Sequence, residues 1–335
     1  MHVAIYHPGC PIPPPDYGGT ERVIYWLGKA LLQFGHQVTL IAAQGSQIPG
    51  AEVRSLNPNE TSGDKWTRLI PDSADLLHLW ATPSVALHRP FLVTIEGNGV
   101  PGQTFHPNTV FVSRKHAANH NSRHFVFNGL DPADYSFSEK RDDYALFLAK
   151  ARWNVKNLEG AKQVVRAAGV ELRVLGSRNW PMNLHRLLPA IRGVRYYGMI
   201  GGDEKRELLA RARCLIFPVR WHEPFGVALT EALASGCFVA GTPYGSLPEI
   251  ISSDVGVLSA RAADLADAMR NPGRFPPATC RNRVLHGGFT HLDMAREYLR
   301  CYEAVLSRGR LGDANEPTPE TTKGFLAKEL LPWHE

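Results

Sequence analysis

The feature that most constrains the fold is a repeated alternation of short apolar runs with longer segments of helical spacing. The apolar runs contain little polar alternation, which is typical of strands buried on both faces of a parallel sheet. Residues 2–45 begin the pattern as a β-α-β unit, in which a proline-rich loop follows the first strand and Gly35 ends the helix. We therefore predict an α/β protein built on parallel sheets.

The alternation runs twice, separated by a charged stretch at residues 138–143. Because 335 residues are more than one hydrophobic core usually needs, two domains are expected. We place an N-terminal domain at 1–137, a C-terminal domain at 138–285, a crossover helix at 286–306 and a linker and tail at 307–335, with a short helix at 325–333. After the strands at 2–6 and 37–42, further strands are predicted at 75–80, 91–95, 110–112, 125–127, 144–149, 171–175, 195–198, 214–218 and 237–240.

Charge is distributed unevenly between the predicted domains. Residues 1–137 contain 9 lysines and arginines against 10 acidic residues, whereas residues 138–335 contain 28 against 22. The basic excess favours a phosphate-bearing small molecule in the second half, and the absence of a clustered basic run argues against nucleic acid or an anionic membrane surface. No apolar run approaches the roughly 20 residues of a membrane span, and no signal peptide is recognisable, so we expect a cytoplasmic protein.

The most informative segment spans residues 223–236. Pro224 suits the first turn of a helix and Gly236 its end. Glu223 and Glu231 are eight positions apart, a little over two turns, so both carboxylates project toward one side. The helix start offers backbone N–H groups to an anion at Phe225, Gly226 and Val227. A diphosphate flanked by hydroxyl-bearing groups fits this arrangement.

The segment reads Glu-Pro-Phe-Gly-x4-Glu-Ala-x-Ala-x-Gly and resembles the Glu-x7-Glu motif of the family 4 retaining glycosyltransferases. The resemblance extends over almost all of residues 1–306. It implies the GT-B fold, in which two Rossmann-like domains face a cleft and a C-terminal helix crosses back toward the N-terminal domain. Other landmarks of the family occur in order, at Tyr17-Gly18-Gly19-Thr20-Glu21, Gly35-His36-x-Val38-Thr39, Asn128-Gly129-Leu130-Asp131 and Gly245-Ser246-Leu247-Pro248-Glu249.

The resemblance also implies an activity, which is transfer of a sugar from a nucleoside-diphosphate sugar of UDP or GDP type to a hydroxyl acceptor, with retention. The acceptor class stays open among saccharides, lipid-linked molecules and small molecules, and no protein-bound metal or cofactor is expected. The alternative is a catalytically silent GT-B protein that binds a nucleotide sugar or partners an active enzyme. In the family, the first Glu contacts sugar hydroxyls and the second contacts the ribose, which implies those roles for Glu223 and Glu231.

Further site residues follow from the family register. Gly18 and Gly19 would let the backbone approach the donor phosphates. Lys150 and Lys156 replace a basic pair that usually begins with Arg, and would stabilise the departing diphosphate; Arg152 is a nearby substitute. The base pocket is assigned to Met199 and Ile200.

Glu96 stands where many relatives carry a His, directly after the predicted strand at 91–95. Its carboxylate would replace an imidazole at the cleft floor. Three roles stay open: binding a sugar hydroxyl, acting as base toward the acceptor, or capping the glycine-rich turn.

Two other patterns have ordinary explanations. The histidines His116, His120 and His124 have helical spacing, but no carboxylate or Cys completes a metal site and the helix is expected to end before His124. Ser246 and Glu249 have the spacing of a capping box, which favours a local helix-start role.

Overall fold

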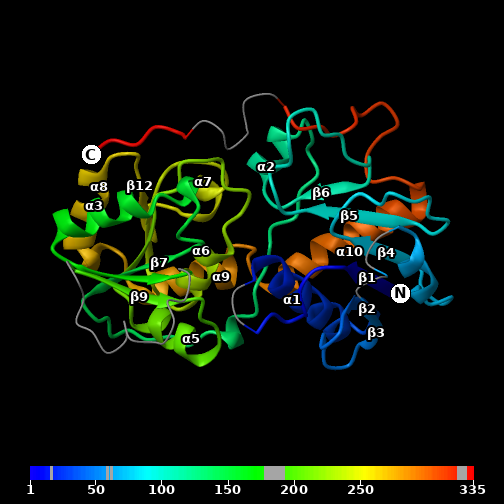
Figure 1. The fold of residues 1–335 in the computed structure, drawn as a ribbon, viewed down its shortest axis with the longest axis horizontal. Helices are drawn as coiled ribbons and strands as arrows, with labels where there is room; N and C mark the ends of the chain where they lie inside the picture. The colour runs from blue at the N-terminus through cyan, green and yellow to red at the C-terminus, as the bar shows by residue number, and fades with distance from the viewer. Residues whose placement is uncertain (16–17, 58–59, 61–62, 177–192, 323–329) are drawn as a thin grey trace. The chain divides into compact units, whose positions relative to one another are not determined.

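The computed structural model describes residues 1–15, 18–57, 60, 63–176, 193–322 and 330–335. The chain divides into a first unit, Met1–Asp131 with Thr290–Phe325, and a second unit, Pro132–Phe289 with Leu326–Glu335. Each unit is built on one parallel sheet of six described strands (Figure 1). The two Rossmann-like domains expected from the sequence are therefore present, and the chain passes between them after Asp131 rather than at the predicted 137/138.

The first sheet has the order β3-β2-β1-β4-β5-β6. Its direction of winding reverses between β1 and β4, the point at which open α/β sheets place a ligand-binding crevice. Val3 and Ile5 of β1 are fully buried, as an apolar run in a parallel sheet requires. Its strands are β1 (His2–His7), β2 (Gln37–Ala43), β3 (Glu52–Leu56), β4 (Leu76–Leu79), β5 (Phe91–Ile95) and β6 (Thr109–Phe111). Its helical segments are α1 (Gly19–Gln33), η2 (Lys65–Leu69) and α2 (Arg114–Asn119).

The second sheet repeats this topology in the order β12-β11-β10-β7-β8-β9, and its winding reverses between β7 and β10. Its strands are β7 (Tyr144–Leu148), β8 (Glu171–Leu175), β9 (Val194–Gly198), β10 (Cys214–Phe217), β11 (Phe238–Gly241) and β12 (Gly256–Leu258). The accompanying α-helices are α3 (Leu158–Ala168), α5 (Gly202–Arg211), α6 (Val227–Ala234), α7 (Leu247–Ile250), α8 (Ala262–Arg270) and α9 (Pro277–His286). Short 3-10 turns are η3 (Pro132–Asp134), η4 (Asn154–Lys156) and η5 (Pro272–Arg274).

Helix α10 (His291–Arg308) follows α9 in the chain but belongs to the first unit. It packs against α1 and β5 (Figure 1). Two buried tyrosines fix its register: Tyr302 Oη lies 2.7 Å from His78 Nδ1, and Tyr298 Oη lies 2.9 Å from Thr94 Oγ1. The predicted return of a C-terminal helix to the N-terminal domain is confirmed.

Several local predictions differ from the structure. The predicted strand at 125–127 forms only a single bridge, from Phe125 to Phe111. Helix α1 begins at Gly19, with Gly18 as its N-cap and no side-chain capping hydrogen bond. Part of the predicted helix at 325–333 lies outside the described residues, and 330–333 are not helical. In the described part of the chain, no helix is long and apolar enough to cross a membrane.

Candidate functional site

The candidate site of the second unit lies at the carboxyl edge of its sheet, where the winding reverses. Strand β7 ends at Leu148 and leads into the loop that carries Lys150 and Lys156. Strand β10 ends at Phe217, and Glu223 follows six residues later. Because β7 and β10 are parallel neighbours, their carboxyl ends bring these residues to one edge of the sheet.

Glu223 is a buried carboxylate whose two oxygens differ in their hydrogen bonds. Oε2 accepts hydrogen bonds from Lys156 Nζ and from the indole Nε1 of Trp221, both at 2.6 Å. No described residue donates a hydrogen bond to Oε1. Oε1 is also not one of the fully buried side-chain atoms that lack a hydrogen-bond partner. The Lys156 ammonium also lies 4.7 Å from the centre of the Trp221 ring. These donors set the orientation of the carboxylate and leave Oε1 available to a ligand hydroxyl.

The backbone around Glu223 is held by the landmark at 245–249. Gly245 has φ +67, and a Cβ there would come within 2.2 Å of the Glu223 carbonyl oxygen, so only glycine fits. The Ser246 amide donates to that carbonyl at 2.9 Å. The Ser246 hydroxyl donates to the carbonyl of Phe225 at 2.7 Å and makes no side-chain cap to α7. The capping-box prediction for Ser246 and Glu249 is therefore wrong, because the hydroxyl instead fixes the segment that begins α6.

Helix α6 starts with backbone geometry suited to an anion. Gly226 is its N-cap, with φ +82, and it provides no side-chain cap. The first N–H groups of any helix have no acceptor within the helix, and Gly226 and Val227 are only half-buried. Phe225 anchors the turn, since its side chain is buried and its ring lies 6.2 Å from that of Phe289. An anion bound here would also gain from the helix dipole.

Glu231 is buried farther along α6. Its Oε1 accepts hydrogen bonds from Tyr135 Oη at 2.6 Å and from Lys205 Nζ at 2.7 Å, and its Oε2 accepts from Lys205 Nζ at 2.8 Å. Sequence reasoning missed both partners, because Tyr135 lies next to the domain junction and Lys205 lies within a strongly charged helical segment that resembles a solvent-exposed one. Trp221 was missed too, although its place two residues before Glu223 was a visible signal.

The other predicted donor-site residues of the second unit are more open. Lys150 is half-buried, its ammonium lies 4.6 Å from the ring centre of Trp153, and it forms no ion pair with a described residue. Arg152 is exposed. Met199 and Ile200 directly follow β9 and precede α5, so they also stand at the carboxyl edge of the sheet.

The first unit contains the remaining candidates. A Cβ on Gly18 would meet Pro14 and Glu21 at 2.8 Å, so packing alone requires glycine there. A Cβ on Gly19 would meet nothing within 4 Å. Packing within the protein therefore does not explain the second glycine, which stands at the start of α1.

Glu96 directly follows β5. Its Oε2 accepts a hydrogen bond from Asn128 Nδ2 at 2.9 Å, whereas its Oε1 is enclosed without a partner, as is Oδ1 of Asn128. Burial raises the pKa of Glu96 to about 7, and the nearby charge of Glu21 acts in the same direction. Among the described residues, no backbone amide donates a hydrogen bond to either oxygen, which argues against the turn-capping alternative for Glu96.

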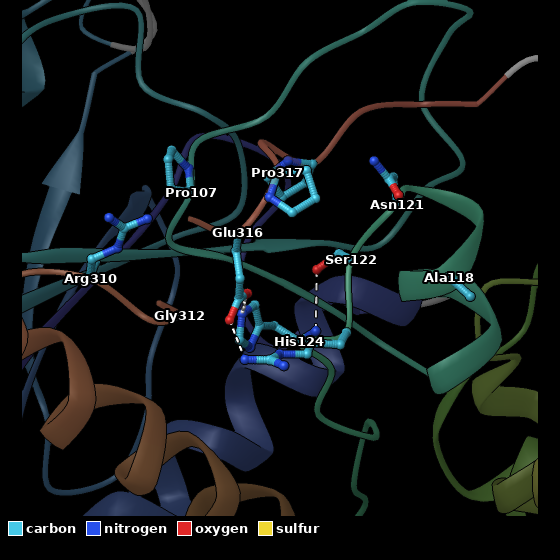
Figure 2. A pocket seen from close by; sticks show the side chains of 11 residues that line it. Pro107, Ala118, Asn121, Ser122, His124, Arg310, Gly312, Glu316 and Pro317 are labelled. Carbon is cyan, nitrogen blue, oxygen red and sulfur yellow. Dashed lines mark hydrogen bonds and ion pairs between the residues drawn. The ribbon is translucent and has the colours of Figure 1, made fainter. Parts of the chain in front are cut away.

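The three regularly spaced histidines have separate partners. Helix α2 ends at Asn119, before His124. His116 Nε2 lies 3.0 Å from the Gly97 carbonyl oxygen, whereas His124 Nε2 lies 2.6 Å from Glu316 Oε2, beside a cavity of about 320 Å³ in the first unit (Figure 2). Among the residues that the structure describes, no three His, Cys, Asp or Glu side chains are grouped to hold a metal ion.

A known family model matches this chain within the second unit. Residues 143–271 match the model of the family described as Glycosyl transferases group 1. The chain is 27% identical over 153 residues to an uncharacterized glycosyltransferase of Methanocaldococcus jannaschii, covering 39% of this chain and 38% of the relative. It is 25% identical over 167 residues to a phosphatidyl-myo-inositol mannosyltransferase of Propionibacterium freudenreichii, covering 43% and 42%. The chain thus spans about two fifths of the length of the curated relatives it matches.

Solved structures match over a much larger share of the chain. A glycosyltransferase involved in avilamycin A biosynthesis has a TM-score of 0.77 and 23% identity, covering 92% of this chain and 98% of that one. The Anabaena protein HepE in complex with UDP-glucose has a TM-score of 0.64 and 12% identity, covering 92% and 100%. The catalytic domain of starch synthase IV from Arabidopsis thaliana, bound to ADP and acarbose, has a TM-score of 0.67 and 13% identity, covering 92% and 99%. The chain therefore has the two-domain fold of the GT-B glycosyltransferases, and its residues 143–271 match group 1 of the glycosyl transferases.

Proposed function

We propose that this protein is a retaining family 4 glycosyltransferase that moves a sugar from a nucleoside-diphosphate sugar to a hydroxyl acceptor. The observation that carries the proposal is the state of Glu223. Two donors occupy its Oε2, whereas its Oε1 accepts no hydrogen bond from a described residue. A carboxylate prepared in this way at a helix start suits a ligand that places a sugar hydroxyl next to a phosphate.

In the proposed donor complex, the diphosphate lies against the amides of Phe225, Gly226 and Val227 and near the Lys150 ammonium. Lys156 serves mainly to hold Glu223, with which it forms a 2.6 Å ion pair. Glu231 accepts a ribose hydroxyl, and Met199 and Ile200 line the base pocket. Relatives of the same fold bound to UDP-glucose and to ADP support a nucleotide donor, for which we propose the UDP or GDP type.

The proposed reaction breaks the bond between the anomeric carbon and the leaving phosphate oxygen while the acceptor oxygen bonds to the same face of that carbon. The acceptor proton passes to the leaving oxygen, so no protein nucleophile and no metal is required. The chain's contribution is electrostatic stabilisation of the diphosphate by Lys150 and the start of α6, together with orientation of the sugar by Glu223.

The first unit is proposed to supply the acceptor side. Gly19, which packing leaves open, would allow close approach of the donor phosphates next to Gly18. Glu96 has an enclosed oxygen without a partner, and we propose that it binds a sugar hydroxyl. In that role, Glu96→Gln loses less activity than Glu96→Ala and shifts the donor preference. A general-base role instead predicts that Glu96→Gln lowers turnover by ~10²- to 10⁴-fold while donor affinity stays unchanged.

The experiment that tests the proposal is thermal stabilisation of the protein by a panel of UDP, GDP and ADP sugars, followed by turnover of the best donor. A donor at about 100 times its Kd should stabilise by about 2.7 kcal/mol. The configuration at the anomeric carbon of the product, read by NMR, then distinguishes retention from inversion. Stabilisation without hydrolysis or transfer would support the silent alternative, and the lack of saturable stabilisation by any donor would contradict both.

A further inference from the structure

We propose that Lys205 and Tyr135 are positioning residues that hold the Glu231 carboxylate ready for a single ribose hydroxyl. The inference rests on the proposed function, which gives Glu231 the ribose. It adds two residues from outside the Glu-x7-Glu segment to the donor site.

The three side chains come from separate parts of the second unit. Glu231 is on α6, Lys205 is on α5, and Tyr135 directly follows η3 at the domain junction. All three are buried, and the exposed fractions of Glu231 and Lys205 are 3% and 7%. Three hydrogen bonds of 2.6 to 2.8 Å join them.

Burial makes these bonds necessary. Removing a carboxylate from water costs free energy unless an opposite charge and hydrogen bonds replace its hydration. Lys205 is itself buried, so its ammonium needs the carboxylate for the same reason. The Lys205 ammonium bonds to both carboxylate oxygens, which fixes the plane of the group as well as its charge. Neither effect is needed to form α6, because a helix does not require an ionised side chain at its middle.

The count of acceptor positions indicates what remains for a ligand. An ionised carboxylate offers about four lone-pair sites. Tyr135 and Lys205 use both positions on Oε1, and Lys205 uses one on Oε2. About one position, on Oε2, remains, so Glu231 would accept one ribose hydroxyl and the two other residues would determine its direction.

The test compares wild type with Lys205→Met and Tyr135→Phe. Nucleotide affinity is measured by titration calorimetry, and kcat and KM are measured for the same proteins. Loss of a hydrogen bond to a charged group predicts a rise in Kd of ~10- to 100-fold for Lys205→Met and a smaller rise for Tyr135→Phe. Because uniform binding is removed, KM should rise while kcat changes little. Matched controls are Lys162→Met, which removes an exposed ion pair with Glu159, and Tyr144→Phe, which removes a buried phenolic hydrogen bond to the Leu208 carbonyl.

A double-mutant cycle with Glu231→Gln separates positioning from a general effect on folding. If Lys205 acts through Glu231, Lys205→Met should raise Kd much less in the Glu231→Gln background than in the wild type. If Lys205→Met raises Kd by the same factor in the wild-type and Glu231→Gln backgrounds, the inference is overturned. If Lys205→Met does not fold, Lys205→Arg and Tyr135→Phe give the same comparison.

The outcomes also separate this inference from the proposed function. Wild-type protein that binds no nucleotide in the panel contradicts the proposed function, and the inference with it. Wild-type binding that Glu231→Gln weakens, but that Lys205→Met and Tyr135→Phe leave unchanged, contradicts the positioning role alone.

Discussion

Replacement of Glu96 by Gln should stabilise the protein at high pH and have little effect at low pH. Burial raises the pKa of this carboxyl from 4.5 to about 7, so the folded state favours its neutral form. A raised pKa contributes stability that is fully present below the unfolded value and is lost as the pH rises through the folded value. Gln is neutral at every pH and can still accept the hydrogen bond from Asn128 Nδ2.

The size of the effect follows from the shift. A difference of about 2.5 pKa units at about 1.4 kcal/mol per unit sets an upper limit of about 3.5 kcal/mol at pH 9. The local geometry agrees with the sign, because Glu96 Oε1 and Asn128 Oδ1 are both enclosed without a partner. A proton on Glu96, or the amide of Gln, gives this pair of side chains a donor that the ionised carboxylate lacks.

The assay is denaturation of wild type and Glu96→Gln at several values of pH between 4.5 and 9. The difference in free energy of unfolding should grow between pH 5 and 8 and then level off. Glu303→Gln, an exposed change on α10 of the same unit, is the control and should show no such growth. A difference that is constant across this range, or that favours wild type at high pH, would refute the reasoning.

Four further outcomes are expected. Glu223→Gln should lower turnover because the sugar is misoriented, whereas Glu231→Gln should mainly weaken nucleotide binding; equal nucleotide affinity in wild type and Glu231→Gln would argue against a ribose contact. Lys156→Met should lower the free energy of unfolding by about 3–5 kcal/mol, because it leaves Glu223 buried without its cation, and denaturation will show whether adding Glu223→Gln restores part of the loss. Turnover should persist after dialysis against a chelator, and a loss that added Mg²⁺ or Mn²⁺ reverses would refute metal independence. Finally, the protein should not cosediment with anionic vesicles, and salt-sensitive cosedimentation would contradict the charge analysis.

Much of the fold was predictable because its signals are local. The bounds of β5 and β8 match the predicted 91–95 and 171–175, since apolar runs bounded by turn residues determine buried parallel strands. Strands β3 and β12 were not predicted. Both are at sheet edges, where one side of the strand is unpaired and the apolar run is correspondingly weak.

The candidate site was predictable only where its residues are consecutive. The segment from Glu223 to Gly236 contains its own helix start, the proposed anion site and two carboxylates. Tyr135 and Lys205 lie 96 and 26 positions from Glu231, and only the tertiary fold brings them to it. Ser246 shows the converse case, because a local motif predicted a cap whereas a carbonyl 21 positions away took its hydroxyl.

The most direct test of the account is titration of the best nucleotide sugar from the panel into wild type, Glu223→Gln and Glu231→Gln, combined with turnover of the same three proteins. We expect saturable binding and retaining transfer by wild type, weakened nucleotide binding by Glu231→Gln, and bound nucleotide with impaired transfer for Glu223→Gln. Binding and transfer that both variants retain at wild-type levels would contradict the assignment of the donor site to α6 and the segment before it.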